Sequence, residues 1–520
     1  MDSRKRFLNK SALVCPFATG NFIVYSSWII TFMSKELPDR TNDFSGWYTQ
    51  VVSRAGLADH GPVKGTMVIK PYGFQLWDNI KESFDAMIKA TGHVNAYFPL
   101  FIPKSFLARE AEHVEGFAKE CAVVTHTRLK ADDDHGVVVD PESKLEEEII
   151  VRPTSETVIW SMYKKWIQSY RDLPLLINQW VNVVRWEMRT RLFLRTSEFL
   201  WQEGHTAHAT AEEAQTETLD ILELYRQLAE DYLAVPVFTG VKTDSEKFAG
   251  ANKTYCIEAM MGDKRALQAG TSHNLGQNFA KAFDVTFQTK DNKEELVWAT
   301  SWGVSTRLVG AVILTHGDQK GLRLPPRIAP IQVVIIPIFR NEEQEKAVKD
   351  YLLPLMEAME NSGIRAHQDW TDNSPGFKFN EWEMKGVPLR MEVGPRDVEK
   401  GNVVVARRDS GEKSFLSKEE AVEQIPKLLD DIQTGLFEQA RQFRDENTHI
   451  VSTYDKFKKV IQKGGFVRCG WDGSEKTEAT IKDQTKATIR CIPFDEHPDG
   501  LMCIFSGDPA KHEVIFAKAY

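Results

Sequence analysis

Arginine side chains gather between two alternating segments within residues 178–210. The first segment predicts a β-strand with four residues on one face: Val181, Val183, Arg185 and Glu187. The loop that follows carries three more guanidinium groups, those of Arg189, Arg191 and Arg195. Phosphate oxygens accept the forked donors of such groups in pairs, so we expect a polyanion there. The alternative is an exposed hairpin with surface salt bridges.

The second segment of this predicted β-hairpin places aromatic and ionisable groups on one face, which carries Phe199, Trp201, Glu203 and His205. An aromatic slot with an acid at its floor is a costly surface unless a ligand covers it, which indicates a binding pocket. His205 and His208 lie three residues apart on a strand, so their rings point to opposite faces. We therefore predict no metal site at this pair.

A polar stretch upstream, residues 149–160, places Arg152, Thr154 and Glu156 around a proline, where a helix is predicted to begin near Ser155. Two interpretations stay open. Thr154 caps the helix, or Thr154 and Glu156 contact a ligand.

Two glycine-containing segments follow the hairpin. The first, residues 266–283, is predicted to hold a turn before a helix, with polar residues around Gly270: Gln268, Thr271, Ser272 and His273. The second, residues 295–316, predicts a strand that breaks at Gly303 into a helix whose first turn carries Ser305, Thr306 and Arg307. An arginine opposes the dipole at a helix N-terminus, so we expect an anion or a stacked base there. A solvated helix tip is the alternative.

Composition describes an ordinary globular protein. The 520 residues are 42% hydrophobic and 27% charged, which predicts two to four domain cores. A formal net charge of -9 argues against non-specific adhesion to nucleic acid, but it allows RNA binding through a local basic face. The six cysteines are sparse and irregularly spaced, which favours a reducing cytoplasm over a disulfide framework.

The first 33 residues have the order of a signal peptide or membrane anchor, because an apolar stretch follows basic residues. Pro16, Gly20 and Asn21 interrupt that stretch, and it lacks the run of about 20 apolar residues that spans a bilayer. We therefore expect no membrane association and favour Met33 as the natural start. Residues 1–33 would be an N-terminal extension without a fold of its own, and an uncleaved targeting segment is the alternative.

Mixed helices and strands are predicted over residues 34–325. Residues 73–91 have helical spacing, and residues 96–103 resemble a strand held by two prolines. This pair fits a dimer interface and a helix buried on a sheet equally well.

A separate α/β domain is predicted over residues 326–435, where strands and helices alternate. Aromatic and basic groups share its rim: the 371–386 loop, the 394–397 turn, Arg407 and Arg408. Such groups suit splayed single-stranded bases, and a solvated domain edge is the alternative.

These segments together resemble class II aminoacyl-tRNA synthetases, whose second and third signature motifs match the Arg185–Phe199 region and the Gly303–Arg307 helix start. The strings RPTSET, FLRTSEFLWQEGH, QAGTSHNLGQNF and TSWGVSTR resemble the prolyl-tRNA synthetases of the archaeal and eukaryotic-like type over residues 34–520. The resemblance implies an α+β fold with an antiparallel catalytic sheet flanked by helices, over residues 34–325. It implies an α/β anticodon-binding domain (326–435), a small α+β C-terminal domain (436–520) and a homodimer.

The resemblance also assigns roles to single residues. It implies that Arg185, Glu187 and Arg307 form the catalytic set. The residues implied to surround ATP and its Mg²⁺ are Arg185, Arg195, Thr196, Phe199, Gln268, Thr271, Ser305 and Arg307. The residues implied to bind L-proline are Thr154, Glu156, Arg185, Trp201, Glu203, His205 and His273.

The implied reaction joins L-proline to ATP as prolyl-adenylate and transfers it to tRNA(Pro). Attack of a carboxylate on the α-phosphorus needs alignment and charge neutralisation but no protein nucleophile. A noncatalytic tRNA-binding or regulatory relative, or a class II ligase for another small amino acid, is the alternative. Relatives bind zinc near the C-terminus through four cysteines. This sequence keeps Cys469 and Cys503 but has Ser474 and Phe505 at the other two positions, so we predict no structural zinc.

Overall fold

The structure is a computed structural model that describes residues 36–107 and 120–520. The predicted N-terminal extension, residues 1–33, lies outside the described residues. Among the helices that the structure does describe, none combines the length and the apolar character needed to cross a membrane.

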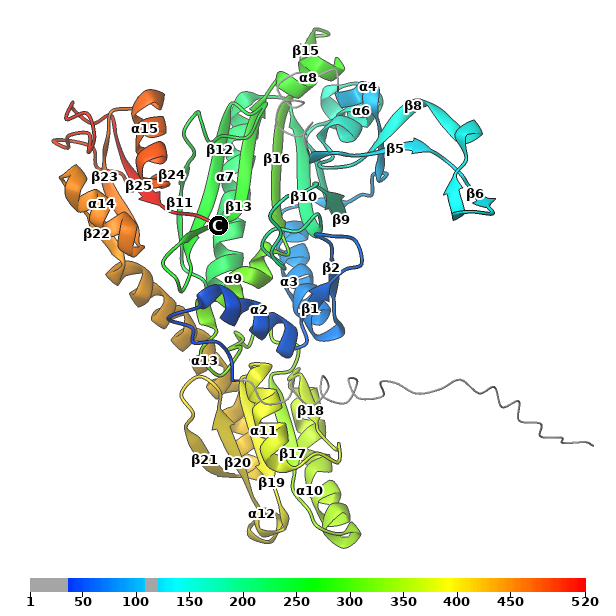
Figure 1. Cartoon of the computed structure of the whole chain (residues 1–520), viewed down its shortest axis with the longest axis vertical. Helices are drawn as coiled ribbons and strands as arrows, with labels where there is room; N and C mark the ends of the chain where they lie inside the picture. The colour runs from blue at the N-terminus through cyan, green and yellow to red at the C-terminus, as the bar shows by residue number, and fades with distance from the viewer. Residues whose placement is uncertain (1–35, 108–119) are drawn as a thin grey trace, which may run out of the picture.

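An eleven-stranded sheet forms the centre of the upper part of the molecule (Figure 1). In spatial order its strands are β22 (Thr448–Ile450), β23 (Phe466–Trp471), β25 (His512–Ala517), β24 (Thr488–Pro493), β11 (Val237–Val241), β12 (Lys253–Met260), β13 (Ala266–Gly276), β16 (Trp298–Ser305), β10 (Glu198–His208), β9 (Leu175–Val184) and β3 (Val94–Asn95). Neighbouring strands are antiparallel except for the β22–β23 and β3–β9 pairs at the two edges. The predicted antiparallel sheet of an α+β protein is confirmed.

The predicted β-hairpin is the β9–β10 pair, which is in register from Val184↔Glu198 to Leu175↔Ala207. One detail of the prediction is wrong, because β9 ends at Val184 and both Arg185 and Glu187 lie in the connecting loop. The Arg185 N–H still donates to the Ser197 carbonyl oxygen at 2.8 Å, and the Trp186 N–H then donates outside the hairpin, to the Glu120 carbonyl oxygen at 2.7 Å.

The turn predicted around Gly270 is also wrong, since residues 266–276 are the continuous strand β13 between β12 and β16. Small polar residues suggested a turn, but Gly270 serves close packing. A Cβ there would lie 2.9 Å from Val304 and 3.3 Å from Tyr225. Likewise β16 runs through Gly303 to Ser305 instead of breaking at the glycine.

Helices bury their apolar faces against this sheet in two cores. One core joins Trp47, Phe84, Tyr225, Trp302 and Val309. Its helices are α2 (Phe44–Arg54), α3 (Pro71–Ala90), α7 (Ala211–Gln227) with its π-helical continuation η4 (Leu228–Tyr232), and α9 (Arg307–His316). The second core lies under α6 (Glu156–Trp166) and α8 (Asn278–Phe283). The helix predicted over residues 73–91 is therefore α3, and its apolar stripe is buried within the chain.

Short elements complete the upper part. A small sheet of β4 (Phe101–Pro103), β8 (Lys144–Val151) and β5 (Ala122–His126) supports a projecting hairpin of β6 (Leu129–Asp132) and β7 (Gly136–Val139) (Figure 1). The remaining pairs and turns are β1 (Ala58–His60) with β2 (Met67–Ile69), β14 (Thr286–Gln288) with β15 (Glu294–Leu296), α4 (Lys104–Leu107), η2 (Pro141–Ser143) and η3 (Tyr170–Asp172).

The predicted α/β domain forms the lower part of the molecule in Figure 1. Its five strands, in spatial order, are β18 (Ala366–Gln368), β17 (Val333–Pro337), β19 (Leu389–Val393), β20 (Asn402–Arg407) and β21 (Lys413–Ser417). Its helices are α10 (Glu342–Asn361), α11 (Pro375–Met384), α12 (Pro395–Lys400) and α13 (Lys418–Glu446). Helix α13 continues through residue 435 and leads to the C-terminal part.

The C-terminal part adds its strands to the central sheet. Strand β24 pairs with β11 through Gly240↔Pro493 and Val241↔Ile492, while α14 (Tyr454–Lys463) and α15 (Glu475–Thr485) lie beside it. At this seam the buried Glu258 carboxylate accepts from Lys242 Nζ at 2.7 Å and from Arg490 Nη2 at 2.9 Å. A buried charge is tolerated only with such partners. The contact between the C-terminal strands and the central sheet is therefore fixed by these ion pairs as well as by apolar packing.

Candidate active site

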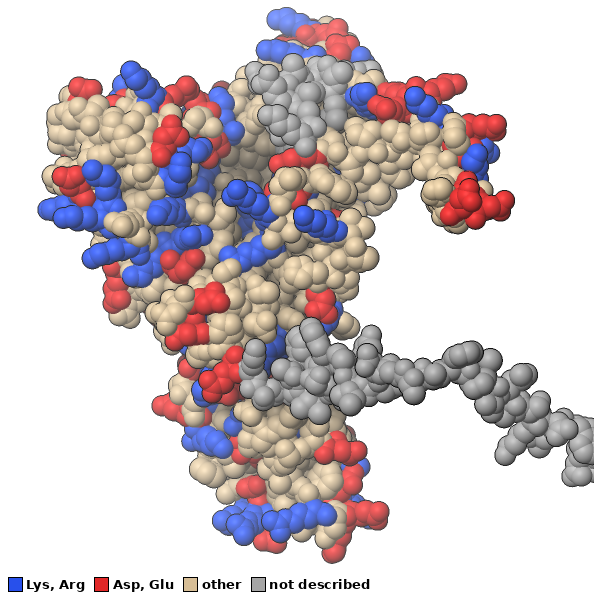
Figure 2. All heavy atoms as spheres, in the orientation of Figure 1, with Lys and Arg blue, Asp and Glu red and all other residues tan. Residues whose placement is uncertain are grey.

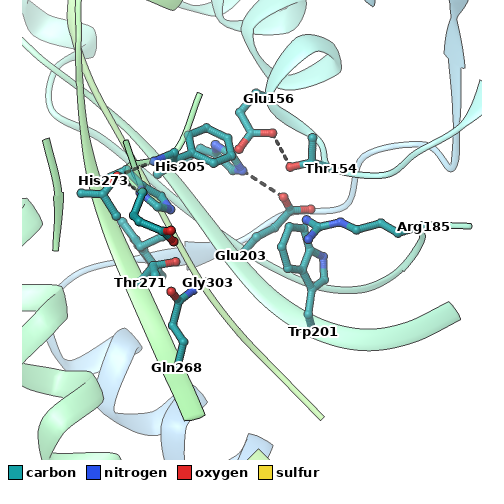
Figure 3. Close-up of a pocket in the computed structure, with 15 residues that line it drawn as sticks. Thr154, Glu156, Arg185, Trp201, Glu203, His205, Gln268, Thr271, His273 and Gly303 are labelled. Atoms are coloured by element: carbon teal, nitrogen blue, oxygen red, sulfur yellow. Dashed lines mark hydrogen bonds and ion pairs between the residues drawn. The ribbon is translucent and has the colours of Figure 1, made fainter. Parts of the chain in front are cut away.

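A cavity of about 200 Å³ opens on the β10 face of the central sheet (Figure 3). A second hollow of about 110 Å³ adjoins it. We call the first the inner cavity and the second the outer hollow. Both are lined by the same five residues where they meet: Arg185, Trp201, Gln268, Thr271 and Gly303. Two ligand groups bound in these spaces would therefore meet beside the Arg185 guanidinium.

Glu203 forms a fixed wall of the inner cavity. Its side chain is buried, and its Oε1 accepts from Ser155 Oγ at 2.5 Å and from Gln179 Nε2 at 2.6 Å. Its Oε2 lies 3.1 Å from His205 Nε2. With both oxygens occupied by protein partners, the carboxylate holds the wall in shape.

Trp201, Glu203 and His205 share one face of β10, which confirms the predicted alternation. Gly204 between them is required, because a Cβ would lie 2.0 Å from the Trp302 indole on the other face. His208 also points to that other face, where Nε2 lies 2.7 Å from Thr206 Oγ1. The two histidines of the HxxH spacing therefore have separate surroundings, as predicted.

Thr154 and Glu156 line the inner cavity where α6 begins. The Thr154 hydroxyl donates to the Glu156 carboxylate, and both side chains are buried. The alternative in which Thr154 caps the helix is wrong, since Ser155 occupies the N-cap position. The Glu156 charge acts across the cavity on Arg185, His205 and His273. A cationic group entering this end of the cavity would meet a negative charge.

The pKa values of the two histidines of the cavity shift in opposite directions because their surroundings differ. Burial lowers the pKa of His273 to about 4, and its Nδ1 lies 2.9 Å from Thr254 Oγ1 while its ring stacks on Phe248. Burial also acts to lower the pKa of His205, but the hydrogen bond to Glu203 and the charge of Glu156 outweigh it and raise that pKa. His273 is thus a neutral flat wall near neutral pH.

Arg185 stands between the two spaces. Its Nε donates to the Pro153 carbonyl oxygen at 3.0 Å, which fixes the guanidinium about its long axis. The group lies 5.3 Å from the centre of the Trp201 ring and 5.5 Å from that of Phe199. Burial lowers the pKa of Arg185, and nearby carboxylates led by Glu156 oppose this effect. Arg185 is therefore a preorganised cation at the junction.

The outer hollow brings Phe199, Ser305 and Arg307 together, as the sequence suggested. Arg307 begins α9, and its side chain donates to the carbonyl oxygens of Leu194 (3.2 Å) and Gln268 (3.4 Å). Burial, together with the charges of Arg195 and Arg185, lowers the pKa of Arg307 to about 10. Clustered guanidinium groups with carbonyl partners favour an anionic ligand.

Three predicted residues lie outside the lining of both spaces. Arg195 is half exposed, and its Nε forms an ion pair with Glu187 Oε1 at 3.3 Å. The Thr196 hydroxyl donates to the Glu198 carbonyl oxygen at 2.7 Å. The three residues are thus Arg195 and Glu187, which pair with each other, and Thr196, which is buried; all lie in the loop that also holds Arg185.

The sequence did not predict five of the residues that line the inner cavity: Glu246, Phe248, Thr254, Ser301 and Trp302. Thr254 and His273 are direct partners across the β12–β13 pair, so only strand pairing brings them together. Alternation of polar and apolar residues over 253–260 would have predicted a strand with one face toward a polar cavity. Strand β12 is buried on both faces, so its sequence does not give that signal.

Three family models match this chain. The tRNA synthetase class II core domain (G, H, P, S and T) matches residues 139–316, which contain both spaces. An anticodon binding domain matches residues 332–428, and the C-terminal domain of prolyl-tRNA synthetase matches residues 454–520.

Full-length relatives are also similar. A proline–tRNA ligase of Cytophaga hutchinsonii is 56% identical over 491 residues, which cover 94% of this chain and all of the relative. Proline–tRNA ligases of Porphyromonas gingivalis and Bacteroides fragilis are 58% and 57% identical. Each covers 94% of this chain, and the matches span 99% and 100% of the relatives.

The His205–Glu203 contact predicts a pH-dependent contribution to stability. The folded-state pKa of His205 is raised, so its contribution is full below the unfolded value of about 6.5 and is lost as pH rises through the folded pKa. His205→Gln should therefore lower the free energy of unfolding more at about pH 6 than at about pH 9. Urea unfolding followed by tryptophan fluorescence measures this difference.

His208→Gln is the matched control, because burial lowers the pKa of His208 and reverses the sign. Its effect on the free energy of unfolding should be larger at the higher pH. Equal pH dependence in the two variants would contradict the assigned environments.

Proposed function

The chain belongs to the prolyl-tRNA synthetase family of class II aminoacyl-tRNA synthetases, and from this membership we propose that it is a proline–tRNA ligase. The enzyme activates L-proline with ATP to prolyl-adenylate and transfers the prolyl group to the 3′ end of tRNA(Pro). The observation that carries the proposal is the Arg185 guanidinium between a small cavity and an arginine-lined hollow.

L-proline is proposed to occupy the inner cavity. Its ammonium group would face Glu156 and Thr154, and its carboxylate would face Arg185. The ring would lie against Trp201 and the neutral His273, in a wall that Glu203 and His205 hold in shape. Opposite charges at opposite ends of the cavity suit a zwitterion.

ATP is proposed to occupy the outer hollow. Adenine would lie between Phe199 and Arg307, while Arg185 and Arg195 with Thr196 would approach the phosphates from the loop. Mg²⁺ usually binds through substrate phosphates, and Gln268, Thr271 and Ser305 offer neutral oxygens beside them.

The chain's own part in the reaction is alignment. A prolyl carboxylate oxygen attacks the α-phosphorus and pyrophosphate leaves, so two anions must be held close while charge develops on the phosphoryl oxygens. Arg185 is placed to approach both anions, and its hydrogen bond to Pro153 fixes its direction before they bind. Glu187 would hold Arg195 in the rim of the same site.

Two alternatives are disfavoured. A noncatalytic relative would have no need to keep Arg185, Glu187 and Arg307 as buried or paired groups. A ligase for another small amino acid would have little use for the flat wall of Trp201 and His273.

The lower domain, placed at residues 326–435, is proposed to bind the anticodon of tRNA(Pro). Cations lie over aromatic rings on this domain, with Arg390 4.2 Å from the Phe379 ring centre and Lys385 4.3 Å from that of Trp382. The half-buried Phe379 with Arg390 can stack with an unpaired base, whereas Trp382 is buried. Figure 2 shows further Lys and Arg side chains over the C-terminal part, residues 436–520, which suit RNA phosphates.

We also propose a homodimer that works in the cytoplasm. Large apolar side chains are exposed near the β3 edge of the sheet, among them Phe74, Val94, Tyr97 and Phe101. Tyr97 is 74% exposed. Exposing a large aromatic ring to water is unfavourable, and a partner surface would cover it. Cytoplasmic location is supported by the free thiols of the described cysteines. Sedimentation velocity at micromolar concentration should give a dimer, and a monomer with full charging activity would contradict this.

No structural zinc is expected in the C-terminal part. Cys469 and Cys503 are buried near each other, but Ser474 is the N-cap residue of α15 and Phe505 packs edge-on against Tyr454, with ring centres 5.2 Å apart. A closed zinc site needs four ligands. Elemental analysis of protein purified without chelators should find no stoichiometric zinc. The double variant Ser474→Cys, Phe505→Cys is the positive control, and one zinc per unaltered chain would contradict the prediction.

Arg185→Ala should lower proline-dependent exchange of pyrophosphate into ATP by a factor on the order of 10²–10³, because one preorganised donor is lost. Folding should survive, as judged by circular dichroism. Arg128→Ala, which removes an exposed guanidinium paired with Asp140 on the distant β6–β7 side, is the control and should keep normal exchange. Near-normal exchange by Arg185→Ala would show that the role of Arg185 is wrong.

A further inference from the structure

A bidentate ion pair joins the catalytic part to the lower domain. Asp318 follows α9, and Arg408 follows β20, ninety positions later in the chain. Arg408 Nη1 donates to Asp318 Oδ2 at 2.7 Å, and Nη2 donates to Oδ1 at 2.6 Å. Parallel double hydrogen bonds of this kind fix direction as well as distance.

Each partner is held by further bonds on its own side. Arg408 Nε donates to the Glu383 carbonyl oxygen at 2.9 Å, and only 6% of the Arg408 side chain is exposed. Asp318 Oδ1 also accepts from the Lys320 N–H at 2.9 Å. Burial acts to raise the pKa of Asp318, but the bonds to Arg408 outweigh it and lower that pKa. The pair is therefore more than a solvated surface contact.

Hydrogen bonds and helix α9 connect Asp318 to elements of the active site. The Asp318 carbonyl oxygen accepts from Trp47 Nε1 at 2.9 Å, on helix α2. The next residue of α2, Tyr48, donates its hydroxyl to the Leu192 carbonyl oxygen at 2.8 Å, in the loop that carries Arg195. Helix α9, which ends just before Asp318, begins at Arg307.

The Arg408 side belongs to the proposed anticodon-binding surface. Arg408 N–H donates to the Pro388 carbonyl oxygen at 2.9 Å, beside β19, which carries Arg390. Backbone bonds reinforce the junction, because Leu322 N–H donates to Met384 O at 3.0 Å. A hollow of about 170 Å³ lies along the junction, and its lining includes Arg390, Arg407 and Arg408.

We propose that the Asp318–Arg408 pair is a positioning contact that sets the anticodon-binding domain relative to the active site. This inference rests on the proposed function. A tRNA that binds both parts gains affinity only if the distance and direction between them match its shape. Proline and ATP are proposed to bind in the catalytic part alone. The link from Asp318 to Trp47 uses the Asp318 backbone carbonyl, which side-chain substitutions keep, so we expect the activation reaction not to depend on the Asp318–Arg408 pair.

A direct RNA contact by Arg408 is the competing explanation. The two explanations differ in what Asp318 does. If Arg408 bound RNA, removing the Asp318 charge would free the guanidinium for a phosphate and would not lower tRNA charging. If the pair positions the domain, removing either partner lowers charging to the same extent.

The experiment compares Asp318→Asn, Arg408→Gln and the double variant in two assays. The first is proline-dependent pyrophosphate exchange, and the second is charging of a tRNA(Pro) transcript. Each single variant should lose about tenfold in kcat/KM for tRNA, and the double variant should lose no more, since one contact is removed once. Exchange should be unchanged in all three, which also shows that the variants fold.

Lys320→Gln is the matched control. Lys320 pairs with Glu383 at 3.0 Å across the same junction, but 67% of its side chain is exposed, so its loss should change neither assay. The proposal would be overturned by normal charging in Asp318→Asn, by additive losses in the double variant, or by parallel losses in both assays. Absence of proline-dependent exchange in the unaltered chain would instead overturn the proposed function.

Discussion

A carboxyl group that is buried in the sheet and needs hydrogen-bond partners there organises the active site. Glu203 is buried on β10, where the loss of hydration costs several kcal/mol unless hydrogen bonds replace it. Its donors are Ser155 before α6, Gln179 on β9 and His205 on β10 itself. These elements must therefore take one mutual arrangement, and that arrangement also shapes the inner cavity. Site geometry and local stability rest on the same contacts.

The C-terminal part obeys the same constraint at a second place. Glu258 on β12 is buried with Lys242 and Arg490, and Arg490 comes from β24. The chain end also returns to the sheet, because the Tyr520 hydroxyl donates to Asp263 Oδ2 at 2.7 Å, just before β13. Strand β13 carries Gln268, Thr271 and His273, so the last residues of the chain support the strand that lines both spaces.

Local patterns in the sequence determined which groups share a face. Period-two alternation placed Trp201, Glu203 and His205 together and separated His208 from them, because successive side chains of a strand point to opposite sides. The motif strings determined the family and the α+β class, and they pointed to Arg185 and Arg307 as the cations of the site. Such inferences need only the chain's own periodicity or its likeness to relatives.

The tertiary structure decided which charges have partners. Small polar residues around Gly270 suggested a turn, but β12 and β16 pair with that segment on both sides and make it a strand. The bonds of Glu203 to Ser155 and Gln179, and of Arg408 to Asp318, join positions far apart in the chain. A buried charge is stable only where such partners converge, and their convergence depends on the packing of whole elements. Periodicity along one segment carries no information about which distant segment will lie against it, so these partners became known only from the fold.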